Sequence, residues 1–277
     1  MTLRHALVAA AVCLVSSAAG AQFPYDVPYV PTPYVVVEEM LRLAGVGPED
    51  FVMDLGSGDG RILITAVKKF GARGIGVDLD PDRIEESVYN AQLYGVADRV
   101  SFQQQDLFKF DIGRATVITM YLLPSVNIRL RPRLLELKPD TRIVSHDFDM
   151  EDWRPDAKST IRKNVFLWIV PAAAGGRWRT TVALPAGSRS YDIEIRQKFQ
   201  EIDGLARYDK KVAGLWNAKL AGDRISFVIV DDSGELESNL YFEGRVAGDA
   251  IEGVIRRGVG TDETRIPWRA GRVSAAQ

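Results

Sequence analysis

The sequence predicts two consecutive folds: an α/β doubly wound sheet, then a small all-β domain built as an antiparallel meander or barrel. Between residues 51 and 170, short β-forming apolar runs alternate with helical patterns, and glycines cluster where the first run ends. Beyond residue 177 the helical patterns stop and turn signals recur. Strands that alternate with helices predict a parallel sheet covered on both faces.

In the first half of the chain, the spacing of apolar residues predicts each strand and helix. Runs of β-forming residues predict strands at 51–55, 74–79, 100–104, 116–121, 142–146 and 165–170. Apolar residues at helical spacing predict helices around 36–43, 63–70, 81–91 and 125–137, with Pro81 opening its helix. The segment 23–33 is rich in proline and tyrosine and is expected to be extended.

The second half is expected to consist of strands separated by turns. Tyr191, Ile193 and Ile195 alternate with charged residues, which is the pattern of a half-buried strand. The phrase Ala-Gly-Asp-x-Ile occurs at 221–225 and again at 247–251, and both copies suggest hairpin turns.

The N-terminus is typical of an export signal. Arg4 and His5 precede an apolar run that ends in small residues at Ala21, and Gln22 is the expected new terminus. The run is shorter than the roughly 20 apolar residues that a membrane-spanning helix needs. The expected division is a signal peptide at 1–21, a ligand-binding α/β domain at 22–171, a linker at 172–176 and a β-rich domain at 177–277. The protein is expected to be exported, to the periplasm.

Composition narrows the possible functions. The 277 residues carry 35 basic and 37 acidic side chains, a formal net charge of -2, so a general nucleic-acid binder is not expected. The only cysteine, Cys13, lies in the expected signal, and His146 is the one histidine beyond it. No disulfide, thiol chemistry or metal site is therefore expected. No transmembrane segment is expected after signal removal, and the oligomeric state is left open.

The segment Val52–Arg61, VMDLGSGDGR, carries the strongest functional signal. A strand runs into Asp54, and Gly56, Gly58 and Gly60 follow at alternate positions before a helix. Glycine allows a tight turn and lets a ligand approach the backbone, where the free N–H groups of the helix start can meet it. Such a loop can also be a plain turn of an α/β sheet, so it needs support from other residues.

Two acidic residues at neighbouring strand ends give that support. Asp78 ends the second expected strand about 20 residues after the glycines, a spacing at which a carboxylate binds ribose hydroxyls. Asp106 ends the third strand above the same edge of the sheet. A dinucleotide is the rival ligand, but Arg61 stands where its fingerprint requires a third glycine. A nucleoside that bears an amino acid fits better.

The segments DLGSGDGR, GVDLDP and QDLF resemble the motif set of class I S-adenosylmethionine-dependent methyltransferases, which have a Rossmann-like doubly wound sheet. With the upstream YVPTP at Tyr29–Pro33, they are most similar to the protein-lysine methyltransferases typified by the ATP-synthase c-subunit enzyme and its archaeal relatives. The similarity covers about residues 29–170.

This resemblance implies S-adenosyl-L-methionine as cofactor and direct in-line transfer of its methyl group, with a lysine amine of a protein substrate as the expected acceptor. It also implies a set of cofactor-binding residues. These are Asp54, Gly56, Ser57 and Gly58 at the methionine part, Asp78 at the ribose, Asp106 and Leu107 at the adenine, and Tyr29 and Thr32 closing over the site.

The acceptor pocket is expected at the end of the fourth strand. Tyr121 is the first candidate to shape it, and a tyrosine that merely caps the sheet edge is an equal alternative. The Asn/Asp-Pro-Pro-aromatic motif of enzymes that methylate nucleobase or glutamine nitrogens is absent there. His146 ends the fifth strand and is a second candidate, either as a base or substrate contact or as a structural residue.

Two other functions stay open at this point. S-adenosylmethionine is made inside cells, so an exported chain without a catalytic motif is compatible with a non-catalytic envelope binding protein that retains a nucleoside pocket. The unspecific acceptor region is also compatible with a small-molecule methyltransferase.

Overall fold

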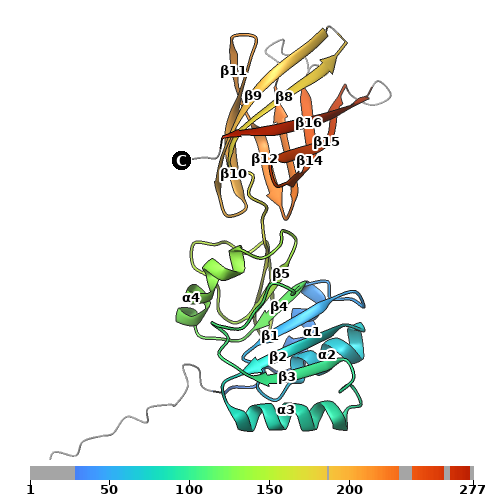
Figure 1. The fold of residues 1–277 in the computed structure, drawn as a ribbon, viewed down its shortest axis with the longest axis vertical. Coiled ribbons are helices and arrows are strands. Elements are labelled where there is room, and N and C mark those ends of the chain that lie inside the picture. The colour runs from blue at the N-terminus through green and yellow to red at the C-terminus, as the bar shows by residue number, and fades with distance from the viewer. Residues whose placement is uncertain (1–28, 186, 231–238, 259–262, 275–277) are drawn as a thin grey trace, which may run out of the picture.

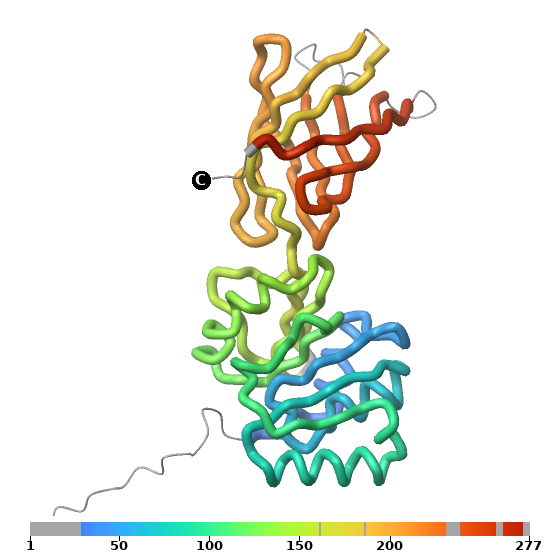
Figure 2. The backbone as a smooth tube through the Cα atoms, in the orientation of Figure 1, coloured from blue at the N-terminus to red at the C-terminus, as the bar shows by residue number. Residues whose placement is uncertain are grey.

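The structure is a computed structural model that describes residues 29–185, 187–230, 239–258 and 263–274. The chain forms two bodies and passes once from one to the other near residue 175 (Figure 1, Figure 2). The first is a sheet with helices, and the second has only strands among its described residues. The expected signal peptide, including Cys13, lies outside the described residues and stays a prediction. No helix in the described ranges has the length and apolar character needed to span a membrane.

The first sheet has the strand order β3-β2-β1-β4-β5-β7-β6. Its strands are β1 (Phe51–Leu55), β2 (Arg73–Asp78), β3 (Val100–Gln104), β4 (Val117–Met120), β5 (Arg142–His146), β6 (Ala157–Ile161) and β7 (Lys163–Ile169). The helices are α1 (Tyr34–Leu43), α2 (Arg61–Phe70), α3 (Pro81–Leu93) and α4 (Pro124–Leu135). Strands β1 to β5 pair in parallel, as predicted.

The expectation of a wholly parallel sheet is wrong at one edge. Strand β7 pairs antiparallel with β5, and β6 pairs antiparallel with β7. Only Arg162, with φ 69°, separates β6 from β7, and so short a connection can join antiparallel strands but not parallel ones. The sequence did not predict β6, because its AKSTI segment is short and mostly polar.

Alternate residues of the strands face two separate core layers. Val52 packs in a cluster with α1, α2 and α3, whereas its neighbour Met53 packs in a cluster with α4. Helices therefore cover both faces, which confirms the doubly wound prediction. The carboxyl ends of β1 to β5 meet at one edge, where ligands of such sheets bind.

The second sheet has the order β11-β10-β9-β8-β16-β15-β14-β13-β12 with antiparallel pairing of neighbours. Its strands are β8 (Gly176–Leu184), β9 (Gly187–Lys198), β10 (Glu201–Tyr208), β11 (Lys211–Gly214), β12 (Trp216–Ala221), β13 (Arg224–Ile229), β14 (Leu240–Ala247), β15 (Ala250–Arg257) and β16 (Thr264–Ser274). Strand β12, at one edge of the sheet, lies close to β10 near the other edge, so the sheet curls into a nearly closed barrel. The antiparallel prediction is confirmed, and the two Ala-Gly-Asp phrases form the β12–β13 and β14–β15 turns.

The turn between β9 and β10 packs against the first body. The Phe199 ring stacks on Trp153 with centroids 5.7 Å apart. The Gln200 side chain accepts a hydrogen bond from Trp153 Nε1 at 3.0 Å and donates to the Arg154 carbonyl at 2.6 Å. The barrel is thus held against the segment that follows β5.

The barrel core makes a stability prediction. Phe242 is buried, stacks on Phe227 at 4.8 Å and meets Trp268 edge-on at 5.0 Å. We expect Phe242→Ala to lower the free energy of unfolding by about 3–5 kcal/mol in urea denaturation, because it leaves a cavity among large rings. Tyr241→Ala is the matched control, since Tyr241 lies next to it on the half-exposed face. Equal losses in the two variants would contradict this account.

Candidate active site

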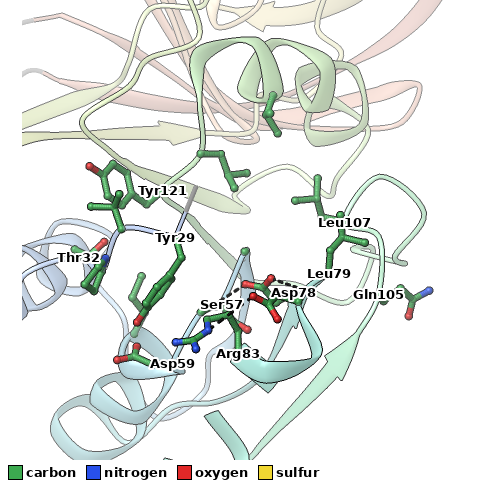
Figure 3. Close-up of a pocket in the computed structure, with 18 of the residues that line it drawn as sticks. Tyr29, Thr32, Ser57, Asp59, Asp78, Leu79, Arg83, Gln105, Leu107 and Tyr121 are labelled. Atoms are coloured by element: carbon green, nitrogen blue, oxygen red, sulfur yellow. Dashed lines mark hydrogen bonds and ion pairs between the residues drawn. The ribbon is translucent and has the colours of Figure 1, made fainter. Parts of the chain in front are cut away.

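A cavity of about 360 Å³ lies at the carboxyl edge of the parallel strands, within the roughly 300–1,000 Å³ of small-molecule sites. It runs from Leu79 and Leu107 at one end, past Asp78 and Tyr29, to Tyr121 at the other (Figure 3). The structure brings most of the predicted residues to its wall. These are Tyr29, Thr32, Gly56, Ser57, Gly58, Asp78, Asp106, Leu107 and Tyr121. Asp54 and His146 are buried and do not line it.

The turn after β1 forms the floor of the cavity. The N–H groups of Gly56 and Ser57 both donate to the Val77 carbonyl, at 2.9 and 3.0 Å, and this ties the turn to β2. Gly58 has φ 52°, and a Cβ there would lie 2.6 Å from the Tyr29 ring. Only glycine combines this backbone conformation with so close an approach.

The Asp78 carboxylate is fixed by the same turn. Its Oδ2 accepts from the Gly58 N–H at 2.9 Å, and its Oδ1 accepts from the Asp80 N–H at 3.1 Å. A carboxylate has about four acceptor positions, so two remain for the hydroxyls of a ribose. The predicted role of Asp78 fits this geometry.

The far end of the cavity suits a flat, apolar ring with polar edges. The Leu79 and Leu107 side chains lie near each other there, with Gln105 beside them (Figure 3). Asp106 accepts from the Phe108 N–H at 2.9 Å, which orders the turn that carries Leu107. An adenine is expected at this end.

The extended segment 29–33, here called the strap, lies across the cavity. Arg61 makes a two-pronged ion pair with Asp59, with Nη2–Oδ2 2.6 Å and Nε–Oδ1 2.9 Å, and its Nη1 donates to the Thr32 carbonyl at 3.1 Å. Arg83 stacks on the Tyr29 ring at 4.7 Å. The sequence did not predict these three contacts, although Asp59 and Arg61 stand inside the VMDLGSGDGR segment.

Asp54 lies beneath the turn instead of on the cavity wall. Its Oδ1 accepts from the Thr119 hydroxyl at 2.7 Å. Burial raises the pKa of Asp54 to about 7, and the nearby charges of Asp78 and Asp59 add to the shift. Asp54 Oδ2 and Ser57 Oγ are both buried with no hydrogen-bond partner among the described residues. Because Ser57 lines the cavity, its unpaired hydroxyl fits the polar amino-acid part of S-adenosylmethionine, whereas Asp54 supports the turn from beneath.

His146 connects the strap to the acceptor end. Thr32 Oγ1 is hydrogen-bonded to His146 Nδ1 at 3.1 Å, and the His146 and Tyr121 ring centroids are 3.9 Å apart. Burial lowers the pKa of His146 to about 4, so the ring is neutral at pH 7. The histidine supports Thr32 and Tyr121 from behind, and a direct role in catalysis stays a prediction.

Comparison with known proteins agrees with this site. The family model of the ANTKMT methyltransferase domain matches residues 54–157. The chain is 50% identical over 151 residues to the protein-lysine N-methyltransferase of Saccharolobus islandicus (strain REY15A), covering 52% of this chain and 94% of that protein. It is 32% identical over 130 residues to the ATP synthase c-subunit lysine N-methyltransferase of Homo sapiens, covering 47% of this chain and 55% of that protein.

A solved structure is also similar. It is an RNA methyltransferase from Salinibacter ruber in complex with S-adenosyl-L-homocysteine, at 53% identity and a TM-score of 0.50. The match covers 51% of this chain and 94% of the other. The cofactor product bound in that relative agrees with the cofactor that the cavity of this chain fits.

The Asp78 carboxylate makes a direct prediction about binding. We expect Asp78→Asn to weaken S-adenosylmethionine binding by about 10- to 100-fold in calorimetric titration, because hydrogen bonds to a charged acceptor are lost. Asp82→Asn, an exposed acid of α3, should bind like the wild type. NAD should bind to none of the three proteins. Unchanged affinity in Asp78→Asn would refute the ribose assignment.

The buried Asp54 makes a prediction about pH. Its pKa is raised on folding, so the folded state holds a proton that the unfolded state releases between about pH 4 and 7. The stability that this proton contributes is lost as the pH rises through that window. We therefore expect the free energy of unfolding of the wild type, relative to Asp54→Asn, to fall from pH 5 to pH 7.5 in urea titrations. A pH-independent difference would contradict the raised pKa.

Proposed function

This chain belongs to the protein-lysine N-methyltransferase family of S-adenosylmethionine-dependent enzymes, and we propose that it methylates lysine side chains of a protein substrate. The observation that carries the proposal is the 50% identity to the Saccharolobus islandicus enzyme over 94% of its length. The cavity supports it, because a cofactor end and an aromatic end lie along one edge of the sheet.

The residues around the cavity bind the cofactor and exclude water from it. When bound, S-adenosylmethionine supplies a methyl group activated by its sulfonium. Asp78 and the glycine turn orient the bound cofactor, and the strap with Tyr29 shields it. Position and a dry site are the main contributions that such a transfer needs from a protein.

The acceptor end favours an uncharged amine. A lysine ammonium must lose its proton before it can attack the methyl group, and burial away from water lowers the pKa of an amine. Tyr121 and the neutral His146 provide such surroundings. Because His146 carries no charge at pH 7, it does not repel the incoming ammonium.

A second candidate substrate comes from the Salinibacter ruber relative, whose description names RNA. The net charge of -2 gives this chain no overall attraction for a phosphate backbone. Protein is therefore the preferred acceptor, and RNA is tested separately in the experiment below.

We expect purified protein with methyl-labelled S-adenosylmethionine to label a protein extract on lysine, read by mass spectrometry of digested products. Parallel reactions contain total RNA or small free amines. Asp78→Asn should lose at least about tenfold of the labelling, in line with its weakened cofactor binding. Label found only in RNA, or only in free amines, would show that the acceptor is not protein. No label in any of the reactions would favour a non-catalytic binding protein.

A further inference from the structure

A lysine of this chain lies at the acceptor end, bound to an acid. Asp147 directly follows β5, and Lys163 opens β7 on the neighbouring strand. The Lys163 Nζ and Asp147 Oδ2 atoms are 2.9 Å apart. The Asp147 N–H donates to the Asn164 carbonyl at 2.7 Å, which fixes the acid beside the strand that carries the lysine.

Aromatic residues flank Asp147 in the chain, with His146 before it and Phe148 after it. Both residues lie against the Tyr121 ring, which lines the cavity. The centroid of the Tyr121 ring is 3.9 Å from that of His146 and 6.1 Å from that of Phe148. Tyr121 also lies close enough to Lys163 to affect its protonation. A carboxylate in a segment that packs on an aromatic ring is a suitable site for an alkylammonium group.

We propose that Asp147, with Tyr121 and Phe148, receives the ammonium group of the substrate lysine, and that Lys163 occupies this position until the substrate displaces it. The proposal rests on the lysine acceptor of the proposed function. Lys163 then acts as a built-in competitor, and Asp147 selects lysine over uncharged acceptors.

The exposure of the pair suits displacement. The Lys163 side chain is 52% exposed, whereas Asp147 is only 19% exposed. The lysine can leave into solvent, but the acid stays partly desolvated and needs a new cation. An exposed ion pair is weak, so a substrate lysine can replace it.

Lys163 is not suited to be the acceptor itself. The hydrogen bond and charge of Asp147 raise the pKa of Lys163, which keeps it an ammonium without a free electron pair. Only a neutral amine can form the new N–C bond. The same contact holds an incoming lysine as an ammonium at the rim, so its proton must leave to solvent before it enters the dry part of the site.

The test is binding of n-butylammonium, a lysine side-chain mimic, in the presence of S-adenosylhomocysteine, followed by NMR titration. We expect Lys163→Ala to bind the mimic about fivefold more tightly than the wild type, the size of an exposed ion pair. Lys163→Arg should show no gain because it keeps the pair. The double variant Asp147→Asn/Lys163→Ala should lose the gain.

Lys158→Ala is the matched control. Lys158 is also exposed, on the adjacent strand β6, but it stacks on Phe166 at 4.9 Å and has no part in the Asp147 pair. Equal gains in affinity for n-butylammonium in Lys158→Ala and Lys163→Ala would mean that the loss of one positive charge anywhere on this face explains the effect. That result would overturn the proposal. Unchanged binding in Lys163→Ala, or a gain that survives Asp147→Asn, would also overturn it.

Two further readouts separate this proposal from the proposed function. With a lysine-bearing protein acceptor, Lys163→Ala should lower the KM severalfold and leave kcat within about twofold. A gain in n-butylammonium binding without lysine methylation would refute the enzyme function but not the ammonium site. Mass spectrometry of the wild type after incubation with S-adenosylmethionine should find Lys163 unmodified, and its methylation would overturn the competitor role.

Discussion

The hydrogen bond from the Gly58 N–H to the Asp78 carboxylate is the contact on which the site depends. It joins the turn after β1 to the end of β2, and the parallel pairing of these strands brings the two groups together. Gly58 makes this contact in the left-handed backbone conformation, with φ 52°. The missing Cβ of Gly58 leaves room for the Tyr29 ring, so this one residue positions both the Asp78 carboxylate and the strap.

Several polar groups around the turn are buried without partners. Asp54 Oδ2, Ser57 Oγ and His146 Nε2 have none among the described residues, and each such group lowers stability. The rest of the fold offsets this loss through two core layers and a densely aromatic barrel. Of these three residues Ser57 lines the cavity, so a bound ligand can supply the contact that its hydroxyl lacks.

Local patterns predicted most of the fold, because strand alternation, helical spacing and the glycine turn are encoded by neighbouring residues. Most of the predicted residues of the cavity wall were instead implied by the family resemblance. Strand β6 was missed, since its AKSTI segment is stabilised by pairing with β7 and not by its own apolar pattern. The clamp of Asp59 and Arg61 on the Thr32 carbonyl joins parts of the chain that only the fold brings together. The placement of Asp54 behind the wall has the same origin, because its partner Thr119 lies on the neighbouring strand β4.

The barrel is attached near the amino end of β5, away from the carboxyl edge that carries the site. The Ala172 N–H, just beyond β7, donates to the Gly222 carbonyl at 2.9 Å, and Arg245 lies 4.0 Å from Asp140, which precedes β5. Its β9–β10 turn packs on Trp153 and Arg154, which follow β5 and the ion pair of Asp147. The barrel also lies outside residues 54–157, the segment that matches the family model. The cofactor half is thus held by contacts internal to the α/β body. Because the barrel packs away from the carboxyl edge of the sheet, the cavity wall formed by the described residues is built by the α/β body alone.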